Sequence, residues 1–229
     1  MAISVNQNTS SLNAINQQYI QRKENDEKLA SGKKINNAAD DAAGLQISNR
    51  LTAQINGAEQ RSLNNEDNVN RNNVKEGGLA AINESLQRAN ELALQSGNPI
   101  NDKNAIQAEL TQITEQVNTL AEDVLGNANF LSTLDANDAN ATQDTLASAL
   151  ASVNQAATEL GANSNALVSQ STTYQTTTVN VSAARSRIQD TDYGSSTAAQ
   201  QQNQTLIQSA IINQKDEDAR KGLLVNQLV

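Results

Sequence analysis

The sequence predicts an all-α fold, an elongated antiparallel helical rod with coiled-coil-like packing. Aromatic residues make up only 2% of the 229 residues, too few for an ordinary globular core. Apolar residues recur in steps of three and four along three long stretches. From Thr145 to Arg187 there is no proline and only one glycine, Gly161. A helix of about 40 residues is about 60 Å long, which indicates a rod rather than a compact domain.

Each of the three stretches predicts a helix with a narrow apolar seam, which excludes water without large aromatic side chains. The seams also fit ordinary amphipathic helices in a bundle, and they leave open how many chains share them. Their members are Leu79, Ile82, Leu86, Ala89 and Ala93; Ile106, Leu110, Ile113, Val117, Leu120 and Val124; and Leu146, Leu150, Val153, Ala157, Leu160, Ser164 and Leu167.

Few breaks interrupt these helices. The stretch SGNPIND holds the only proline and predicts a turn, with Asn101 or Asp102 capping the helix that follows. Gly126 is expected to end that helix. The irregular run after it leaves room for one short β-hairpin near residues 128–142. The β-branched run at residues 171–179 has a lower helix propensity than its surroundings.

Composition disfavours several classes of function. The chain has no cysteine and no histidine, so it lacks thiolate chemistry and the best proton-transfer group at neutral pH. We therefore expect no enzyme, no metal site and no cofactor. A net charge of −9 disfavours a nucleic-acid partner. No apolar run approaches the roughly 18 residues of a membrane span, and the first residues resemble no secretory signal. These facts alone indicate the cytoplasm.

The two ends of the chain differ from its middle. Residues 1–34 and 190–229 are rich in polar and charged residues, and their apolar positions are sparse. Such segments form weak amphipathic helices that are marginal in isolation and become ordered when a partner covers their apolar stripe. This pattern indicates a protein built for assembly.

The stretch INNAADDAAGLQISNRL places Asp40 and Asp41 side by side among small residues. A metal site, a catalytic dyad and a packing corner between helices all fit such a pair. Too few further ligands lie nearby for a committed metal site. The alanines and Gly44 allow backbones to approach closely, and an aspartate before Ala-Ala-Gly can cap a helix that begins near Ala42. We therefore favour the packing corner.

Four stretches of the chain resemble bacterial flagellins. LASGKKINNAADDAAGLQISNRLTAQINGAEQ (residues 29–60) is similar to the N-terminal signature of that family. EGGLAAINESLQRANELALQS and AIQAELTQITEQV are similar to the helices that follow it, and SRIQDTDYGSSTAAQQQNQTLIQSA (residues 186–210) is similar to the C-terminal signature. The variable outer domain that flagellins often carry between these halves is nearly absent.

The resemblance implies a structural subunit that assembles into the bacterial flagellar filament used for motility. Residues 1–40 and 190–229 would be inner-tube terminal helices that pair with each other, and residues 41–189 an outer-tube helical rod. The protein would leave the cell through the flagellar export channel and be extracellular, which reverses the cytoplasmic expectation. Its partners would be copies of itself, an export chaperone, and cap and hook-associated proteins.

Assembly contacts are expected on the apolar stripes of the two ends and at the acidic corner, where the aspartate that does not cap the helix can reach Lys33, Lys34 or Arg50 of a neighbouring subunit. The expected assembly residues are Val5, Leu12, Ile15, Asp40, Asp41, Gly44, Arg50, Leu206, Ile211, Leu224 and Leu228.

Three stretches depart from the family pattern. Arg71, Asn72 and Asn73 replace an apolar face, and mixed-charge blocks occupy residues 21–28 and 215–221. Two alternative functions therefore stay open: a flagellin-like hook–filament junction protein and a specialised non-motile surface filament. An enzyme or surface-binding protein on the same scaffold would need an outer domain with clustered acid–base residues, and the sequence shows none.

The resemblance also implies a recognition patch that vertebrate Toll-like receptors read on flagellin monomers. The matching positions are Leu86, Gln87 and Arg88, followed by Glu109. A simpler interpretation makes Leu86 a core residue and the other three a solvated surface. Helices joined by the Pro99 turn should run antiparallel, which would bring Arg88 and Glu109 onto one exposed face.

Overall fold

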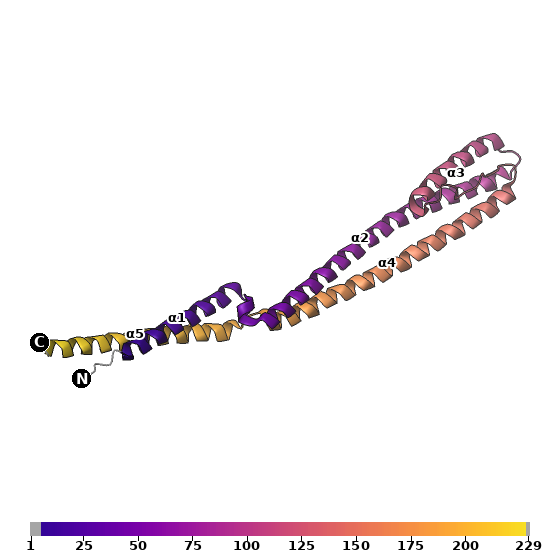
Figure 1. Cartoon of the computed structure of the whole chain (residues 1–229). Helices are drawn as coiled ribbons and strands as arrows, with labels where there is room; N and C mark the ends of the chain where they lie inside the picture. Colours follow the sequence, from indigo (N-terminus) through magenta and orange to yellow (C-terminus); the bar gives the residue numbers. More distant parts are fainter. Residues whose placement is uncertain (1–5, 228–229) are drawn as a thin grey trace. The chain divides into compact units, whose positions relative to one another are not determined.

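The computed structural model describes the backbone of residues 6–227 and the side chains of residues 12–220. The described chain forms five helices: α1 (Asn6–Ser31), α2 (Ala38–Ser96), α3 (Lys103–Leu125), α4 (Ala139–Gln189) and α5 (Tyr193–Gln227) (Figure 1). No strand occurs among these residues, which confirms the all-α prediction. No helix in this part of the chain is long and apolar enough to cross a membrane.

The chain divides into two compact units. The central unit is Gly57–Thr177, and the terminal unit combines the described residues of Met1–Asn56 and Thr178–Val229. The boundaries at residues 40 and 190 expected from the sequence stay a prediction. Helical geometry does break at Asp41 (φ −164°, ψ 100°), and α4 ends at Gln189.

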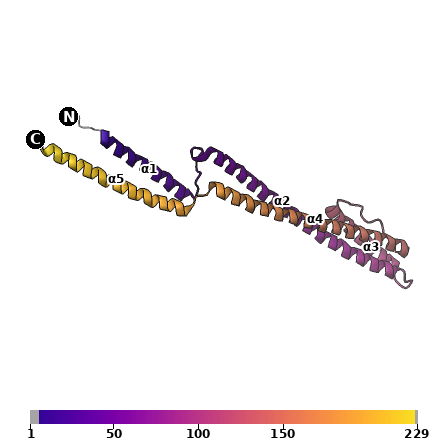
Figure 2. The same cartoon turned by 90° about the horizontal axis from the view of Figure 1, so that it is seen from below.

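In the central unit, α3 packs against α2 and α4 around one apolar core (Figure 2). The apolar periodicity explains which side chains enter that core, because residues three and four apart share one helix face. Leu110 of α3 is fully buried, as are Ile82 and Leu86 of α2. Every member of the first predicted seam is buried: Leu79, Ile82, Leu86, Ala89 and Ala93.

The ends of α3 have the predicted caps. The Asp102 carboxylate accepts hydrogen bonds from the backbone N–H groups of Asn104 (2.9 Å) and Ala105 (3.4 Å). Gly126 adopts a left-handed conformation (φ 70°), and its N–H donates to the carbonyl of Glu122 at 3.0 Å. Both caps satisfy backbone groups that a helix end leaves without partners.

The prediction of a short β-hairpin near residues 128–142 is wrong. Residues 127–138 form a loop, and side chains of α3 take the backbone hydrogen bonds that a hairpin partner would have taken. The Asn118 amide accepts from the Leu131 N–H (2.7 Å) and donates to the Leu131 carbonyl (3.0 Å). Gln107 donates to the Leu134 carbonyl (2.9 Å) and accepts from the Ala136 N–H (2.8 Å). These bonds let Leu131, Leu134 and Ala136 enter the core.

Where α3 no longer covers them, the contact between α2 and α4 combines polar pairs with buried Ala58 and half-buried Val69 and Leu167. Ser62 and Ser171 are both buried and share a hydrogen bond of 2.6 Å. The Asn72 amide donates to the Ser164 hydroxyl at 3.0 Å. The threonine run of α4 is helical despite its propensity, and its hydroxyls donate to carbonyls four residues earlier, as Thr176 does to Thr172 at 2.9 Å.

In the terminal unit, α1 lies against α5 (Figure 2). Polar contacts between the two helices include the Asn25 amide, which donates to the Ser196 carbonyl at 2.7 Å, the Gln200 amide, which donates to Asp26 at 2.6 Å, and the Tyr193 hydroxyl, which donates to the Leu29 carbonyl at 3.3 Å. Ile15 and Ile207 are buried. The terminal helices therefore pair, as predicted.

Candidate assembly surfaces

The acidic stretch forms a tight corner between α1 and the start of α2. Gly32 ends α1 in a left-handed conformation (φ 68°), which a side chain at that position would strain. Two backbone hydrogen bonds then tie the corner to the chain at the end of α4: Lys34 N–H to the Gln189 carbonyl (2.7 Å) and Thr191 N–H to the Gly32 carbonyl (3.0 Å). These hydrogen bonds therefore hold the corner against the chain at the end of α4.

Asp41 is the helix cap that the sequence predicted. Its extended backbone ends the first turn of α2, and its carboxylate accepts from the Gly44 N–H at 2.8 Å. Gly44 is buried, and a Cβ at that position would overlap the side chains of Asp41 and Ile35. A glycine is required there because the cap and the buried isoleucine leave no space.

Asp40 closes the loop before α2. One carboxylate oxygen accepts from the backbone N–H groups of Asn36 (2.8 Å) and Asn37 (2.9 Å). The bond from Asn37, followed by that from Asn36, lowers the pKa of Asp40 below its usual value of 3.8, and the nearby Lys28 charge adds to the effect. Asp40 is therefore ionised, and its hydrogen bonds hold the loop before α2 in place. Its expected contact with a neighbouring subunit stays a prediction.

The other predicted assembly residues fall into different environments. Ile15 is buried within the α1–α5 pair, Ile211 is half-buried, and Leu12, Arg50 and Leu206 are exposed. Val5, Leu224 and Leu228 lie outside the residues whose side chains the structure describes.

Sequence reasoning missed the exposed aliphatic side chains of Ile20 on α1 and Ile212 on α5. Tyr19, an apolar position of the N-terminal stripe, is exposed as well. The irregular spacing of apolar residues in these helices hides such positions, because no single seam separates an inner from an outer face.

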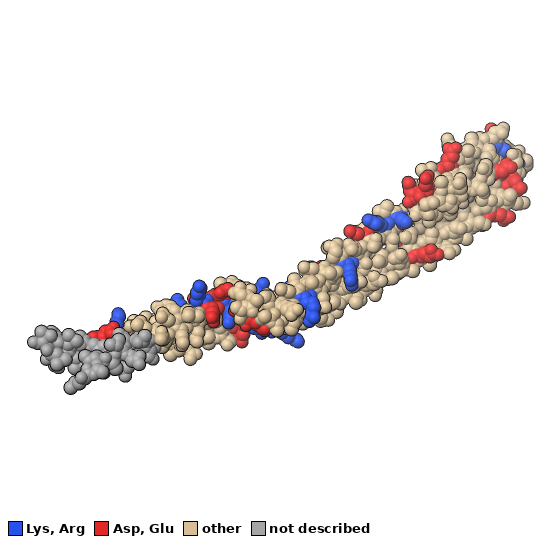
Figure 3. All heavy atoms as spheres, viewed as in Figure 1, with Lys and Arg blue, Asp and Glu red and all other residues tan. Residues whose placement is uncertain are grey.

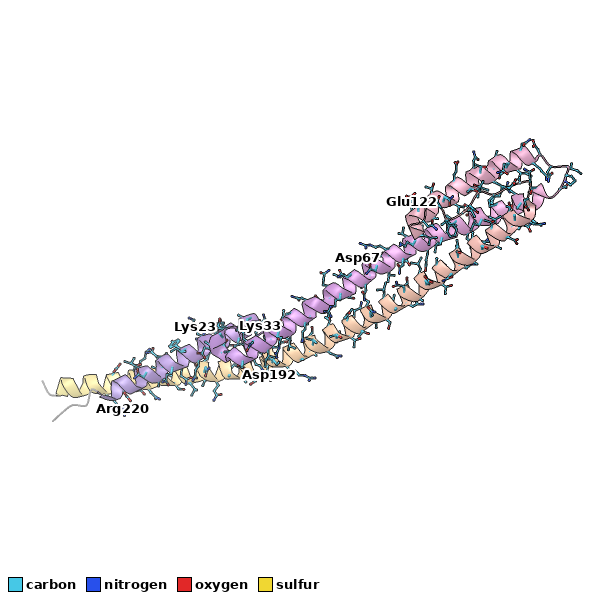
Figure 4. The ribbon with its side chains drawn as sticks, turned by 45° about the vertical axis from the view of Figure 1, so that its right-hand side comes forward. Lys23, Lys33, Asp67, Glu122, Asp192 and Arg220 are labelled. Atoms are coloured by element: carbon cyan, nitrogen blue, oxygen red, sulfur yellow. The ribbon has the colours of Figure 1, made fainter. Side chains whose placement is uncertain are left out.

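Charge is unevenly divided between the units (Figure 3). The central unit holds 15 acidic and 5 basic residues, a net charge of −10, and the remaining 10 acidic and 11 basic residues belong to the terminal unit, which gives the whole-chain value of −9. Figure 4 shows Glu122 on α3 and Asp67 on α2, and it shows Lys33 near the chain crossing at the corner. Ion pairs within the described residues include Arg22 with Asp26 and Arg88 with two glutamates.

Of the predicted recognition residues, the structure brings Arg88 and Glu109 into contact. Leu86 is buried and Gln87 exposed. The Arg88 guanidinium donates through Nε (3.1 Å) and Nη2 (3.0 Å) to Glu109, and through Nη1 to Glu91 at 3.2 Å. The hydrogen bond to Glu109 is the main reason that the pKa of Arg88 is raised. The predicted antiparallel α2–α3 turn is thus confirmed, but the guanidinium already has two carboxylate partners within the chain.

The described residues offer little for chemistry. They contain no group of three or more acidic side chains placed to hold a metal ion. The Asp40 and Asp41 carboxylates bind backbone N–H groups instead. The geometry therefore fits packing and assembly.

The chain is similar to two halves of one protein family. A model of the bacterial flagellin N-terminal helical region matches residues 3–137, and a model of the bacterial flagellin C-terminal helical region matches residues 143–213. Only residues 138–142 separate the two matches, which leaves no space for a large domain between them.

Individual members of this family are also similar to the chain. Polar flagellin A of Vibrio parahaemolyticus is 42% identical over 139 residues, which are 57% of this chain and 36% of the relative. Flagellin C of Vibrio anguillarum is 41% identical over the same coverage. The flagellar filament 41 kDa core protein of Borreliella burgdorferi is 34% identical over 168 residues, 70% of this chain and 50% of the relative. The chain thus spans between about a third and a half of these curated relatives.

Proposed function

Because this chain belongs to the bacterial flagellin family, we propose that it is a structural subunit that assembles with copies of itself into an extracellular flagellar filament used for motility. The observation that carries the proposal is the α1–α5 pair. It buries Ile15 and Ile207 but leaves Leu12, Tyr19 and Leu206 exposed. Exposed aliphatic and aromatic side chains on a thin helix pair favour further burial by neighbouring copies.

In this proposal, the terminal helices and the central helices have different positions in the filament. Residues 1–40 with 190–229 form the inner contacts of the filament, and residues 41–189 form the outer helical layer. The corner at Asp40 and Asp41 fixes where one set of helices ends and the other begins. No step of this function needs a catalytic group, in keeping with a structural protein family.

Imaging of the purified protein tests the proposal. Salt-induced polymerisation should give long filaments in negative-stain electron micrographs. Deletion of residues 186–229 should leave a soluble helical protein that forms none. A hook–filament junction protein would instead stay monomeric or only add to the ends of other filaments, and that result would replace the motile-filament proposal.

The finer partners belong to the same proposal. We expect an export chaperone to bind the terminal helices before secretion, and cap and hook-associated proteins to meet the filament at its ends. Recognition by vertebrate Toll-like receptors would use Gln87, Arg88 and Glu109. A receptor reporter assay with monomeric protein and with Arg88→Ala tests this, since an unchanged signal in the variant removes the patch from the functional surface.

A further inference from the structure

Two short segments of the terminal unit run antiparallel where they connect its helices. Residues 32–34 follow α1, and residues 189–191 lie at the junction of α4 with α5. Backbone hydrogen bonds of 2.7 and 3.0 Å join the two segments, and Lys33 and Asp190 lie opposite each other as an antiparallel pair. We call these two segments the crossing, which Lys33 and Asp192 mark in Figure 4.

The end of α4 takes hydrogen-bond donors from the segment that follows α1. The last four carbonyls of a helix have no partner within the helix itself. At the end of α4, the Lys34 backbone N–H donates to the Gln189 carbonyl at 2.7 Å, and the Lys34 ammonium donates to the Arg187 carbonyl at 3.0 Å. One residue of the other segment therefore satisfies two of these four carbonyls.

The end of α1 takes donors from the chain that follows α4. The Tyr193 hydroxyl donates to the Leu29 carbonyl, in the last turn of α1, at 3.3 Å. The Tyr193 ring also lies close to Gly32, since a Cβ on that glycine would lie 3.0 Å from the hydroxyl oxygen. The helices α1 and α4 thus each end on donors from the segment that follows the other helix.

A buried side chain connects the crossing to α2. Ser48 of α2 is 1% exposed, and its hydroxyl donates to the side-chain carbonyl of Gln189 at 2.8 Å. The backbone carbonyl of the same glutamine accepts from Lys34. A buried hydroxyl without an acceptor is unfavourable, so movement of Gln189 would affect α2 as well as α4.

Neither segment can leave the crossing without loss of hydrogen bonds at both helix ends. Removal of the segment after α1 would take Lys34 from the end of α4 and would separate Tyr193 from the Leu29 carbonyl. Removal of the segment after α4 would break the same bonds. We propose that the crossing opens and closes as one unit, so that the ends of α1 and α4 and the start of α5 become ordered together.

This coupling is a property of the single chain and goes beyond the proposed filament function. Its consequence in a filament does rest on that function: neighbouring copies that cover α1 and α5 would also fix the end of α4 and, through Ser48, the start of α2. The terminal helices would then transmit order to the helices that they adjoin.

Amide exchange of the monomer tests the coupling, because a single opening exposes all the amides that it breaks and changes their rates by one common factor. Tyr193→Phe removes a donor at the end of α1, and Lys34→Met removes the ammonium donor at the end of α4. Each variant should speed exchange of the Lys34 and Thr191 amides alike by roughly threefold to tenfold, the effect of one hydrogen bond. The matched controls Tyr19→Phe and Lys23→Met change exposed side chains of α1 and should alter these rates less than about twofold.

Independent helix caps would give a different pattern. Tyr193→Phe would then speed exchange only in the last turn of α1, and Lys34→Met only in the last turn of α4. That pattern would overturn the proposal, as would a complete lack of protection at the crossing in the unmodified monomer. We expect modest protection there even where the rest of α1 and α5 exchanges fast. Either contrary result leaves the filament function standing, whereas coupled exchange in a protein that forms no filaments would overturn that function alone.

An engineered disulfide tests the geometry of the crossing in a chain that has no cysteine of its own. Lys33 and Asp190 lie between the two backbone hydrogen bonds, which makes them a non-hydrogen-bonded pair. The Cα atoms of such pairs are about 4.5 Å apart, within the range of a disulfide. Lys33→Cys/Asp190→Cys should therefore oxidise within the monomer, and oxidation should slow exchange at the end of α1 and the start of α5 together.

The matched control, Lys33→Cys/Ala183→Cys, moves the second cysteine about two turns back along α4, or about 10 Å. It should form no disulfide within the chain, because that distance exceeds the reach of the bond. Circular dichroism checks that each variant is folded. Equal oxidation of the two double variants would contradict the crossing, and slower exchange on one side only would contradict the coupling.

Discussion

Two adjacent glycines in α2 should respond differently to the same substitution. A Cβ on Gly77 meets nothing within 4 Å, whereas a Cβ on Gly78 would lie well inside 3.0 Å of the Val124 side chain on α3. Alanine stabilises a helix interior by about 0.8–1 kcal/mol relative to glycine. Gly77→Ala should therefore stabilise the protein by about that amount.

Gly78→Ala gains the same helix propensity but overpacks the contact with Val124. Overpacking commonly costs about 1–3 kcal/mol, so the net change should run from near zero to about 2 kcal/mol of destabilisation. The two variants should differ by about 1–3 kcal/mol. For a chain of this size, that difference corresponds to roughly 2–12 °C in the melting temperature.

Thermal and urea unfolding, followed by circular dichroism, measure the difference. The double variant Gly78→Ala/Val124→Ala removes the side chain that the new Cβ meets. Its loss of stability should be smaller than the sum of the two single losses. If Gly78→Ala proved as stable as Gly77→Ala, the close approach of α2 and α3 at this glycine would be refuted.

Three further predictions concern the loop, the corner and the ends. Asn118→Ala removes both hydrogen bonds to the buried Leu131 backbone and should cost about 2–4 kcal/mol in urea unfolding, whereas the exposed Gln112→Ala should cost less than about 0.5 kcal/mol. Asp40→Asn should remove the stability that the Asp40 carboxylate contributes. The pKa of Asp40 is depressed in the folded protein, so this contribution is present above the ordinary pKa of 3.8 and is lost as pH falls through the folded pKa. Unfolding free energies of the two proteins that stay parallel below pH 4 would contradict this prediction. Amide exchange of α1 and α5 should be fast in the monomer and slow in the filament, because their apolar side chains need neighbours, and strong protection in the monomer would contradict the proposed role.

The charged block at residues 215–221, of which Lys221 lies outside the described side chains, extends the last of these tests. If its charges pair between subunits, filament stability should fall with added salt and with acid, because screening and carboxylate protonation both weaken ion pairs. Disassembly that does not depend on salt, measured by sedimentation, would instead indicate charges that face a solvated lumen.

Local signals were sufficient for the helices and their ends. The apolar steps from Leu79 to Ala93 indicated the core face of α2, because burial of a helix face follows its 3.6-residue period. Asp41, Asp102 and Gly126 were identified as helix ends because capping needs only the residue type and its neighbours in sequence. The contact of Arg88 with Glu109 followed from the turn between their helices.

Features that depend on distant partners were not predictable in this way. The loop after Gly126 resembled a hairpin in sequence, but its hydrogen-bond partners are Gln107 and Asn118, two side-chain amides on the preceding helix. Nothing in the sequence marks these two amides among the many asparagines and glutamines of the chain. The threonine run is helical for a related reason: tertiary contacts such as that of Ser171 with Ser62 outweigh a weak local propensity.

The polar α2–α4 contact fixes the register of the two helices better than an apolar seam would. Sliding α4 by one turn would break the Ser62–Ser171 and Asn72–Ser164 hydrogen bonds together, and a buried hydroxyl left without a partner, as at Ser62 or Ser171, costs about 1–3 kcal/mol. Leucine side chains would tolerate such a shift, because apolar contacts have no direction. A polymer that repeats one subunit geometry many times needs this fixed register, since a slip of one turn would move α4 by about 5 Å along α2. The buried serines and the asparagine amides thus specify how α2 and α4 lie against each other, which burial of apolar area alone would not do.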